Sequence, residues 1–174
     1  MMTDCKICGM IKENKLKKVY EDKNLSVVLC PEPAALGHLW VIPKKHYPII
    51  EQIPDYEIGY LFDVANKVSV SLFEVLESQG TNIFVENGIS AGQKYSHVII
   101  NIIPRNPNDN INLAWKPRSL SEEEMSTIEI AVKEQMETVG YFEKEKEEPI
   151  NLDRPKKTIS DEEDYLLKSL RRIP

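Results

Sequence analysis

Apolar residues recur along this chain with two different periods. Over residues 55–79 they return every three or four positions, which predicts one amphipathic helix because this spacing gathers side chains on one helical face. Asp55 is a suitable N-cap for that helix, and Gly80 is a suitable stop. The predicted apolar face consists of Ile58, Leu61, Phe62, Ala65, Val68, Leu72, Val75 and Leu76.

Short apolar runs on both sides of this helix predict strands. Residues 25–29 and 39–43 come before it, and the prolines and Gly37 between them predict a loop that joins an antiparallel pair. Residues 81–86 and 97–103 come after the helix. Strands that precede and follow a long helix, without a regular strand–helix–strand repeat, predict an α+β fold with an antiparallel sheet.

Residues 97–103 carry polar side chains on one side of the predicted strand. Alternate side chains of a strand point to opposite faces. One face should therefore present His97, Ile99, Asn101 and Ile103, and the other Val98, Ile100 and Ile102. A polar, glycine-containing turn at residues 87–93 leads into the strand. This combination predicts the floor of a binding site.

The C-terminal third has a different pattern. Residues 106–112 are polar and predict an irregular connection, which includes Trp115 and Pro117 further along. Ser121 and Glu124 form a capping-box pattern, which predicts a helix with Met125, Ile128, Val132, Met136 and Val139 on one face. A charge run at 143–148 predicts a solvated linker, and a second capping-box pattern at 160–163 predicts a short helix. We therefore expect a domain at 1–118 and a C-terminal helical extension at 119–174.

Composition narrows the classes of function. The 174 residues are 41% hydrophobic and 29% charged, with a formal net charge of −6. Net acidity argues against a general DNA or RNA binder, whose affinity rests on clustered Lys and Arg. No apolar run approaches the roughly 20 residues that span a bilayer, and the N-terminus lacks the apolar core of a signal peptide. Together with few cysteines, this predicts a cytoplasmic protein.

Two of the three cysteines, Cys5 and Cys8, form a C-x-x-C motif. Two thiolates at this spacing can share one metal ion, and structural zinc takes four nitrogen or sulfur ligands. A redox dithiol would need a thioredoxin-like context, which the surrounding pattern lacks. A third alternative is a pair of inert thiols. The only histidines that could complete a metal site are His38, His46 and His97.

The polar turn and the strand after it carry a family resemblance. The turn reads Asn-Gly-x-x-Ala-Gly-Gln, and the strand ends in Ile-Ile-Pro-Arg. Residues 5–115 thereby resemble the histidine triad (HIT) family, whose signature is His-x-His-x-His followed by two apolar residues. The three triad positions are His97, Ile99 and Asn101. In the family the middle histidine attacks a nucleotide α-phosphate, and the isoleucine here has no lone pair with which to attack.

The resemblance also implies a metal site. Some HIT relatives, including galactose-1-phosphate uridylyltransferases, pair an N-terminal C-x-x-C with two histidines. One follows the Val-Ile-Pro-Lys strand and corresponds to His46. The other is the first triad histidine, His97. The resemblance thus implies that Cys5, Cys8, His46 and His97 bind zinc.

A ligand site is implied in the same way. In the family, the histidine at the position of His38 lies near the nucleotide, and the Asn and Gln of the turn, here Asn87 and Gln93, contact its sugar-phosphate. Asn101 can hydrogen-bond a phosphate oxygen, as a glutamine does at the third triad position of uridylyltransferases. HIT relatives usually form two-fold dimers, which implies a homodimer with residues 55–79 near the axis.

One further position departs from the family. Many relatives hold the ribose hydroxyls with an Asp, and Cys30 takes that place here, with Glu32 nearby as a possible substitute.

Three functions therefore remain open. The first is a HIT-type protein that binds a nucleotide or phosphorylated ligand without covalent nucleotidyl transfer, and for which no catalytic residue is assigned. The second is an active nucleotide hydrolase or transferase in which water attacks, with His38 or Glu32 as general base. The third is an interaction module on a HIT scaffold.

Overall fold

The computed structural model describes residues 5–136 and 139–143. These all belong to the first of two units of the chain, Met1–Lys144, and the second unit, Glu145–Pro174, lies outside the described residues. The short helix expected after Ser160 and most of the expected charged linker are therefore outside them too. The division at residue 118 stays a prediction.

The described residues form an α+β fold, as predicted. Five strands make one antiparallel sheet in the order β1-β2-β3-β5-β4. The elements are α1 (Lys6–Lys12), β1 (Lys18–Glu21), β2 (Leu25–Leu29), β3 (Leu39–Pro43), α2 (Asp55–Leu76), β4 (Gly80–Val85), β5 (Ile100–Arg105) and α3 (Glu122–Gln135). The strands expected at 25–29 and 39–43, and their antiparallel pairing, are confirmed. Among the described residues, no helix is both long and apolar enough to cross a membrane.

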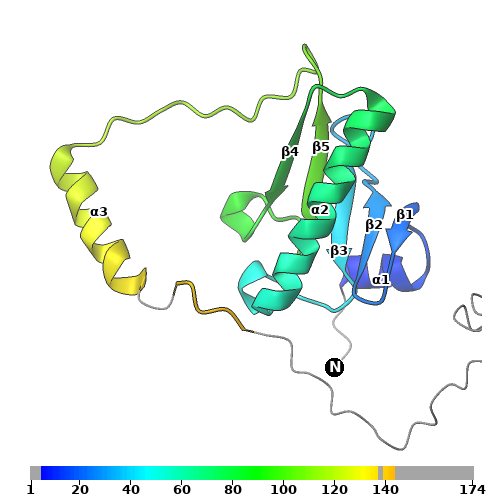
Figure 1. Cartoon of the computed structure of the whole chain (residues 1–174), viewed down its shortest axis with the longest axis horizontal. Coiled ribbons are helices and arrows are strands. Elements are labelled where there is room, and N and C mark those ends of the chain that lie inside the picture. Colours follow the sequence, from blue (N-terminus) through cyan, green and yellow to red (C-terminus); the bar gives the residue numbers. More distant parts are fainter. Residues whose placement is uncertain (1–4, 137–138, 144–174) are drawn as a thin grey trace, which may run out of the picture. The chain divides into compact units, whose positions relative to one another are not determined.

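The long helix α2 lies across one face of the sheet (Figure 1). Its buried side chains pack against β2, β3 and β5 in the main apolar core. The helix is three residues shorter than predicted, because Glu77 adopts a left-handed conformation (φ 50°) and ends it before Gly80, which begins β4. Pro54 is its N-cap, and Asp55 lies in the first turn, where a carboxylate is favourable near the positive end of the helix dipole.

A second apolar cluster covers the opposite face of the sheet. Ile7 of α1 is fully buried there against Val28, Trp40 and Ile42. The sequence pattern did not predict α1, since a seven-residue helix with one fully buried side chain has no readable apolar period. The cluster fixes α1, and with it Cys8, against the sheet.

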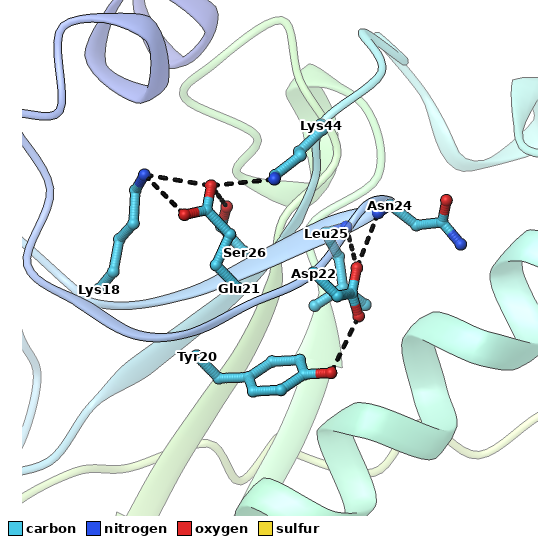
Figure 2. Close-up of polar contacts among 8 residues, drawn as sticks. All are labelled: Lys18, Tyr20, Glu21, Asp22, Asn24, Leu25, Ser26 and Lys44. Carbon is cyan, nitrogen blue, oxygen red and sulfur yellow. Dashed lines mark hydrogen bonds and ion pairs between the residues drawn. The ribbon is translucent and has the colours of Figure 1, made fainter. Parts of the chain in front are cut away.

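The edge strand β1 was also not predicted, because all four of its residues are exposed and show no apolar alternation. Besides its backbone pairing with β2, the strand is held by polar side-chain contacts (Figure 2). The Glu21 carboxylate accepts hydrogen bonds from Lys18 Nζ at 3.0 and 3.1 Å and forms an ion pair with Lys44 at 3.0 Å. The Ser26 hydroxyl donates to the same carboxylate at 3.4 Å.

The turn from β1 to β2 is closed by Asp22. Its carboxylate accepts the backbone N–H groups of Asn24 and Leu25 at 2.7 and 2.9 Å (Figure 2). The Tyr20 hydroxyl donates to it at 3.2 Å, and the Tyr60 hydroxyl of α2 donates at 2.7 Å. These bonds tie the edge of the sheet to the long helix and hold the pKa of Asp22 below its ordinary value against the effect of burial.

Strand β5, which lies between β3 and β4, begins at Ile100, three residues later than predicted. Val98 bonds to the segment after β3 instead, since its N–H donates to the Tyr47 carbonyl at 2.7 Å. The predicted alternation holds nonetheless: Val98, Ile100 and Ile102 lie in the core under α2.

The helix predicted after residue 121 is confirmed as α3, with a complete capping box between Ser121 and Glu124. Its predicted apolar side chains, including Met125, Ile128 and Val132, are exposed. The connection before it is irregular, as predicted. Arg105 fixes the start of that connection through a two-point contact with Asp109, at 2.6 and 3.0 Å.

Candidate metal centre and adjoining cavity

Four donor side chains from distant parts of the chain meet beside α1. Cys5 precedes α1 and Cys8 lies within it, whereas His46 follows β3 and His97 precedes β5. Their candidate ligand atoms all lie within 4.8 Å of one another. The structure therefore brings together the four residues that the resemblance implied.

The distances test whether a zinc ion fits among these atoms. His46 Nδ1 and His97 Nδ1 are 3.4 Å apart, and the sulfur–nitrogen distances are 3.4, 3.5 and 3.7 Å. Ideal Zn–S and Zn–N bonds in a tetrahedron place two nitrogens about 3.4 Å apart, and a nitrogen and a sulfur about 3.6 Å apart. The donor set thus matches tetrahedral zinc in both chemistry and spacing.

His97 is held in the form that a metal needs. Its side chain is 1% exposed, and Nε2 lies 2.9 Å from the Pro43 carbonyl oxygen. A carbonyl can only accept, so Nε2 carries the proton and Nδ1 keeps its lone pair. Burial lowers the pKa of His97, and the nearby His46 lowers it further, whereas the bond to Pro43 opposes this shift. The neutral ligand form is therefore favoured.

The surroundings of Cys8 differ from those of a reactive redox thiol. Burial raises the pKa of Cys8, and the hydrogen bond and charge of Cys5 raise it further. Cys5 Sγ also donates to the Ser96 carbonyl at 3.4 Å. Reactive dithiols have lowered thiol pKa values, whereas a bound cation deprotonates its thiol ligands outright. The metal interpretation therefore fits better than the redox one.

A cavity of about 230 Å³ adjoins this centre on the sheet face opposite α2. His97, Ile99, Asn101 and Ile103 all line it, so the predicted sharing of one face is confirmed. The middle triad position thus presents a hydrocarbon side chain to the cavity. Cys30 and Glu32 line it as well.

His38 is fully engaged beside the cavity. Its side chain is 6% exposed, and Nδ1 accepts the Ala34 N–H at 3.1 Å. The proton of the neutral ring is therefore on Nε2, which donates to Asn101 Oδ1 at 3.1 Å. Burial lowers the pKa of His38, and the bond to Asn101 partly opposes that shift.

Asn101 completes the network with its oxygen and keeps its Nδ2 group for the cavity. Among the described residues Nδ2 has no hydrogen-bond partner, and it is not one of the fully buried unsatisfied atoms. An amide N–H at this place can donate to an oxygen of a bound ligand.

The turn before β5 requires its glycines, since Gly88 and Gly92 have φ of 89° and 92°. Gln93 lines the cavity, but its oxygen accepts the Gly88 N–H at 2.8 Å and its nitrogen donates to Pro48 and Tyr95 carbonyls at 2.6 and 2.9 Å. The side chain braces the turn through three backbone bonds.

Asn87 is not among the residues that line the cavity. Its oxygen accepts the Ile50 N–H at 3.1 Å, and its nitrogen donates to Glu51 at 2.7 Å. Unlike His38, Gln93 and Asn101, it therefore does not face the cavity.

Several cavity residues escaped the sequence analysis. Trp40, Phe84 and Tyr95 supply an aromatic lining, and Glu86 and Lys94 supply charge. A sequence signal existed for Trp40, which lies two residues from His38 on the same strand face. Phe84 reaches the cavity as the cross-strand partner of Asn101, a register that the structure gives.

Comparisons with known proteins agree with this architecture. The family model described as HIT domain matches residues 11–108. The chain is 33% identical over 121 residues to adenylylsulfatase HINT3 of Arabidopsis thaliana, a match that covers 69% of this chain and 60% of that protein. Because the match spans only 60% of the Arabidopsis protein, the activity in its name is not assigned to this chain.

Two solved structures share the fold. A HIT family protein from Bacillus subtilis aligns with a TM-score of 0.70 at 26% identity, covering 76% of this chain and 96% of the other. A zinc-bound histidine triad protein from Mycobacterium smegmatis aligns with a TM-score of 0.60 at 25% identity, covering 78% and 96%. Because the family model matches more than half of its residues, this chain belongs to the HIT family.

Proposed function

We propose that this protein binds a nucleotide or another phosphorylated ligand in the cavity and that zinc stabilises its fold. In this proposal the protein does not form a covalent nucleotidyl intermediate. The observation that carries the proposal is Ile99, whose side chain lines the cavity at the nucleophile position of the family. Nucleophilic catalysis needs a side-chain atom with a lone pair. A hydrocarbon at this position supports binding without transfer.

The role of zinc in this proposal is structural. Cys5, Cys8, His46 and His97 provide four protein ligands, and a four-ligand site leaves no open position at which zinc could activate water. A zinc ion there would join α1, the segment after β3 and the start of β5. It would thereby hold the wall of the cavity that Ile99 and Asn101 form.

The binding part of the proposal rests on complementary surfaces. Asn101 offers N–H groups to a phosphate oxygen, while Trp40, Phe84 and Tyr95 offer aromatic surface. Aromatic side chains and a few placed polar groups are the usual lining of small-molecule sites.

The competing function, hydrolysis by directly attacking water, has less support. A general base needs an available lone pair within reach of water. The lone pair on His38 Nδ1 already accepts the Ala34 N–H, and the Nε2 atom donates to Asn101. Glu32 is an exposed carboxylate paired with Lys94. The Arabidopsis relative is named as an adenylylsulfatase, so this alternative is part of the test.

The homodimer expected from the family belongs to the same proposal. Phe62, Val70 and Phe73 are exposed on one side of α2. An apolar strip of this kind supports a helix-to-helix contact between two copies.

The test combines binding with turnover. Calorimetric titration with nucleoside monophosphates should show binding, while adenosine phosphoramidate, adenylyl sulfate and dinucleoside polyphosphates should turn over far below about 1 s⁻¹, the low end of typical kcat values. Intact-mass spectrometry should find no nucleotidyl-protein. Turnover at enzyme-like rates would overturn the proposal.

Ile99→His provides the complementary arm. It should allow a covalent nucleotidyl-protein to accumulate with the phosphoramidate, because an imidazole then faces the cavity. Ile99→Asn is the matched control: it is polar and similar in size but not nucleophilic, and it should give no adduct.

A further inference from the structure

The cavity has an unbalanced set of charges. Its lining contains two carboxylates, Glu32 and Glu86, and one cationic side chain, Lys94. Lys94 lies in the segment between β4 and β5, whereas Glu32 lies in the loop between β2 and β3. Lys94 Nζ is 3.5 Å from Glu32 Oε2, and the two side chains are 70% and 66% exposed. Since both line the cavity yet remain largely in solvent, the pair joins two loops at the cavity rim.

We infer that Lys94 is the residue that binds the anionic group of the ligand, and that Glu32 is an internal competitor that holds Lys94 until the ligand arrives. The inference rests on the proposed function, because it assigns a specificity-determining role within the same cavity. The two residues act on the ligand by charge and position.

The strength of the pair suits such an exchange. An exposed ion pair contributes little to stability, because water screens it and two long side chains lose freedom in forming it. A phosphoryl group offers more negative charge and more acceptor oxygens than one carboxylate, so it can take over the ammonium group. Asn101 Nδ2, which also faces the cavity, provides a second donor for the same group.

The charge balance further limits which ligands suit the cavity. A single phosphoryl group meets one ammonium and two carboxylates, whereas a triphosphate would add negative charge with no further cation among the described lining residues. The volume of about 230 Å³ points the same way, because small-molecule pockets typically occupy about 300–1,000 Å³. We therefore expect monophosphates to bind more tightly than triphosphates.

The experiment is calorimetric titration at low salt with the four 5′-ribonucleoside monophosphates and their triphosphates. For the tightest monophosphate, Lys94→Met should weaken binding about tenfold, the usual size of a charge-assisted contact. Glu32→Gln should tighten it about three- to fivefold by removing the competitor. In the double variant the gain from Glu32→Gln should vanish, because no ammonium group remains to be released.

Matched controls separate local from general charge effects. Lys23→Met and Glu74→Gln change net charge equally at exposed positions that do not line the cavity, and they should leave affinity within twofold. Thermal unfolding should be unchanged in all single variants.

The results of these titrations separate a failure of the proposed function from a failure of this inference. If none of these nucleotides binds the unmodified protein, the nucleotide-binding part of the proposed function and this inference fall together. If one binds but Lys94→Met has no effect, the inference fails and the proposed function stands. If the gain from Glu32→Gln persists without Lys94, Glu32 repels the ligand directly, and the competitor role is wrong. Tighter binding of triphosphates would overturn the charge limit.

Discussion

The metal centre and the cavity share one short segment of chain but differ in completeness. His97 belongs to the donor cluster, and Ile99, two residues later, lines the cavity. The cluster has all four donors that a structural zinc needs, whereas the cavity lacks the side chain that nucleophilic HIT chemistry needs. The proposed loss of covalent transfer, set beside the complete donor cluster, would mean that the scaffold of this fold and the reaction in its cavity can change separately.

The two regions also differ in how their polar atoms are satisfied. In the cluster, the candidate ligand atoms of two thiols and two imidazoles lie within 4.8 Å of one another, an arrangement that one shared cation would satisfy. Beside the cavity, His38 and Asn101 satisfy each other through a bond of 3.1 Å. Loss of the proposed zinc should therefore have the largest effect on folding, while changes in the cavity should affect ligand affinity and, at the His38–Asn101 bond, stability to a smaller extent.

The largest expected effect concerns the cluster. Cys8→Ser removes one of four ligands and should abolish stoichiometric zinc, measured by metal analysis of the purified protein. The free energy of unfolding should fall by about 4 kcal/mol or more, the stabilisation given by a ligand present at 1,000 times its Kd. The measurement is denaturant unfolding with and without a chelator.

Cys30→Ser is the control for that variant, because Cys30 belongs to the second apolar cluster and is not one of the four donors. It should retain zinc. Equal stability of the unmodified protein with and without the chelator would contradict the structural role.

The C-x-x-C spacing of this centre is a local signal in the sequence, and the family resemblance supplied its two histidines, one after β3 and one before β5. Their meeting in space follows from the antiparallel pairing of β3 with β5. The lining of the cavity was less predictable. Lys94, Glu86 and Phe84 reach the cavity through the course of a turn and a neighbouring strand, and no periodicity in their own segments marks them.

The fold shows the same limit. Strands β2 and β3 were predictable because they are buried almost throughout and form apolar runs, and helix α2 was predictable because one buried face gives it an apolar period. Strand β1 was not, since Glu21 and Asp22 hold it by polar contacts whose partners lie elsewhere in the chain, among them Lys44 and Tyr60. The apolar stripe of α3 predicted a helix correctly but not its exposure.

The second prediction tests the self-satisfied network. Asn101→Ala leaves the buried His38 Nε2 without its acceptor, and an unsatisfied buried donor costs about 1–3 kcal/mol. Stability should fall by this amount and monophosphate affinity should fall with it, as measured by thermal unfolding and calorimetry. Asn101→Asp keeps an acceptor for His38, so it should retain more stability while binding an anionic ligand less well.

A smaller effect separates Asn87 from the cavity. Asn87→Ala removes the bonds to Ile50 and Glu51 and should cost about 1 kcal/mol of stability. Monophosphate affinity should stay within twofold, because Asn87 does not line the cavity. A large loss of affinity in titration would instead support the role implied by the family resemblance.

The smallest expected effect is a pH dependence from His38. Burial puts its pKa in the folded state below the ordinary value of 6.5. Near that pH the unfolded chain therefore binds more protons than the folded one, and stability rises with pH. Between pH 7 and pH 6 the contribution that is lost is at most about 0.7 kcal/mol, if only the unfolded state titrates. Comparing denaturant unfolding of the zinc-loaded protein with that of His38→Gln isolates this contribution, because all other titrating groups are common to both. The contrary result would be a free energy of unfolding that falls less steeply in the unmodified protein than in the variant as the pH decreases. It would mean that His38 takes up its proton in the folded state, so that the cavity holds a cation beside Asn101.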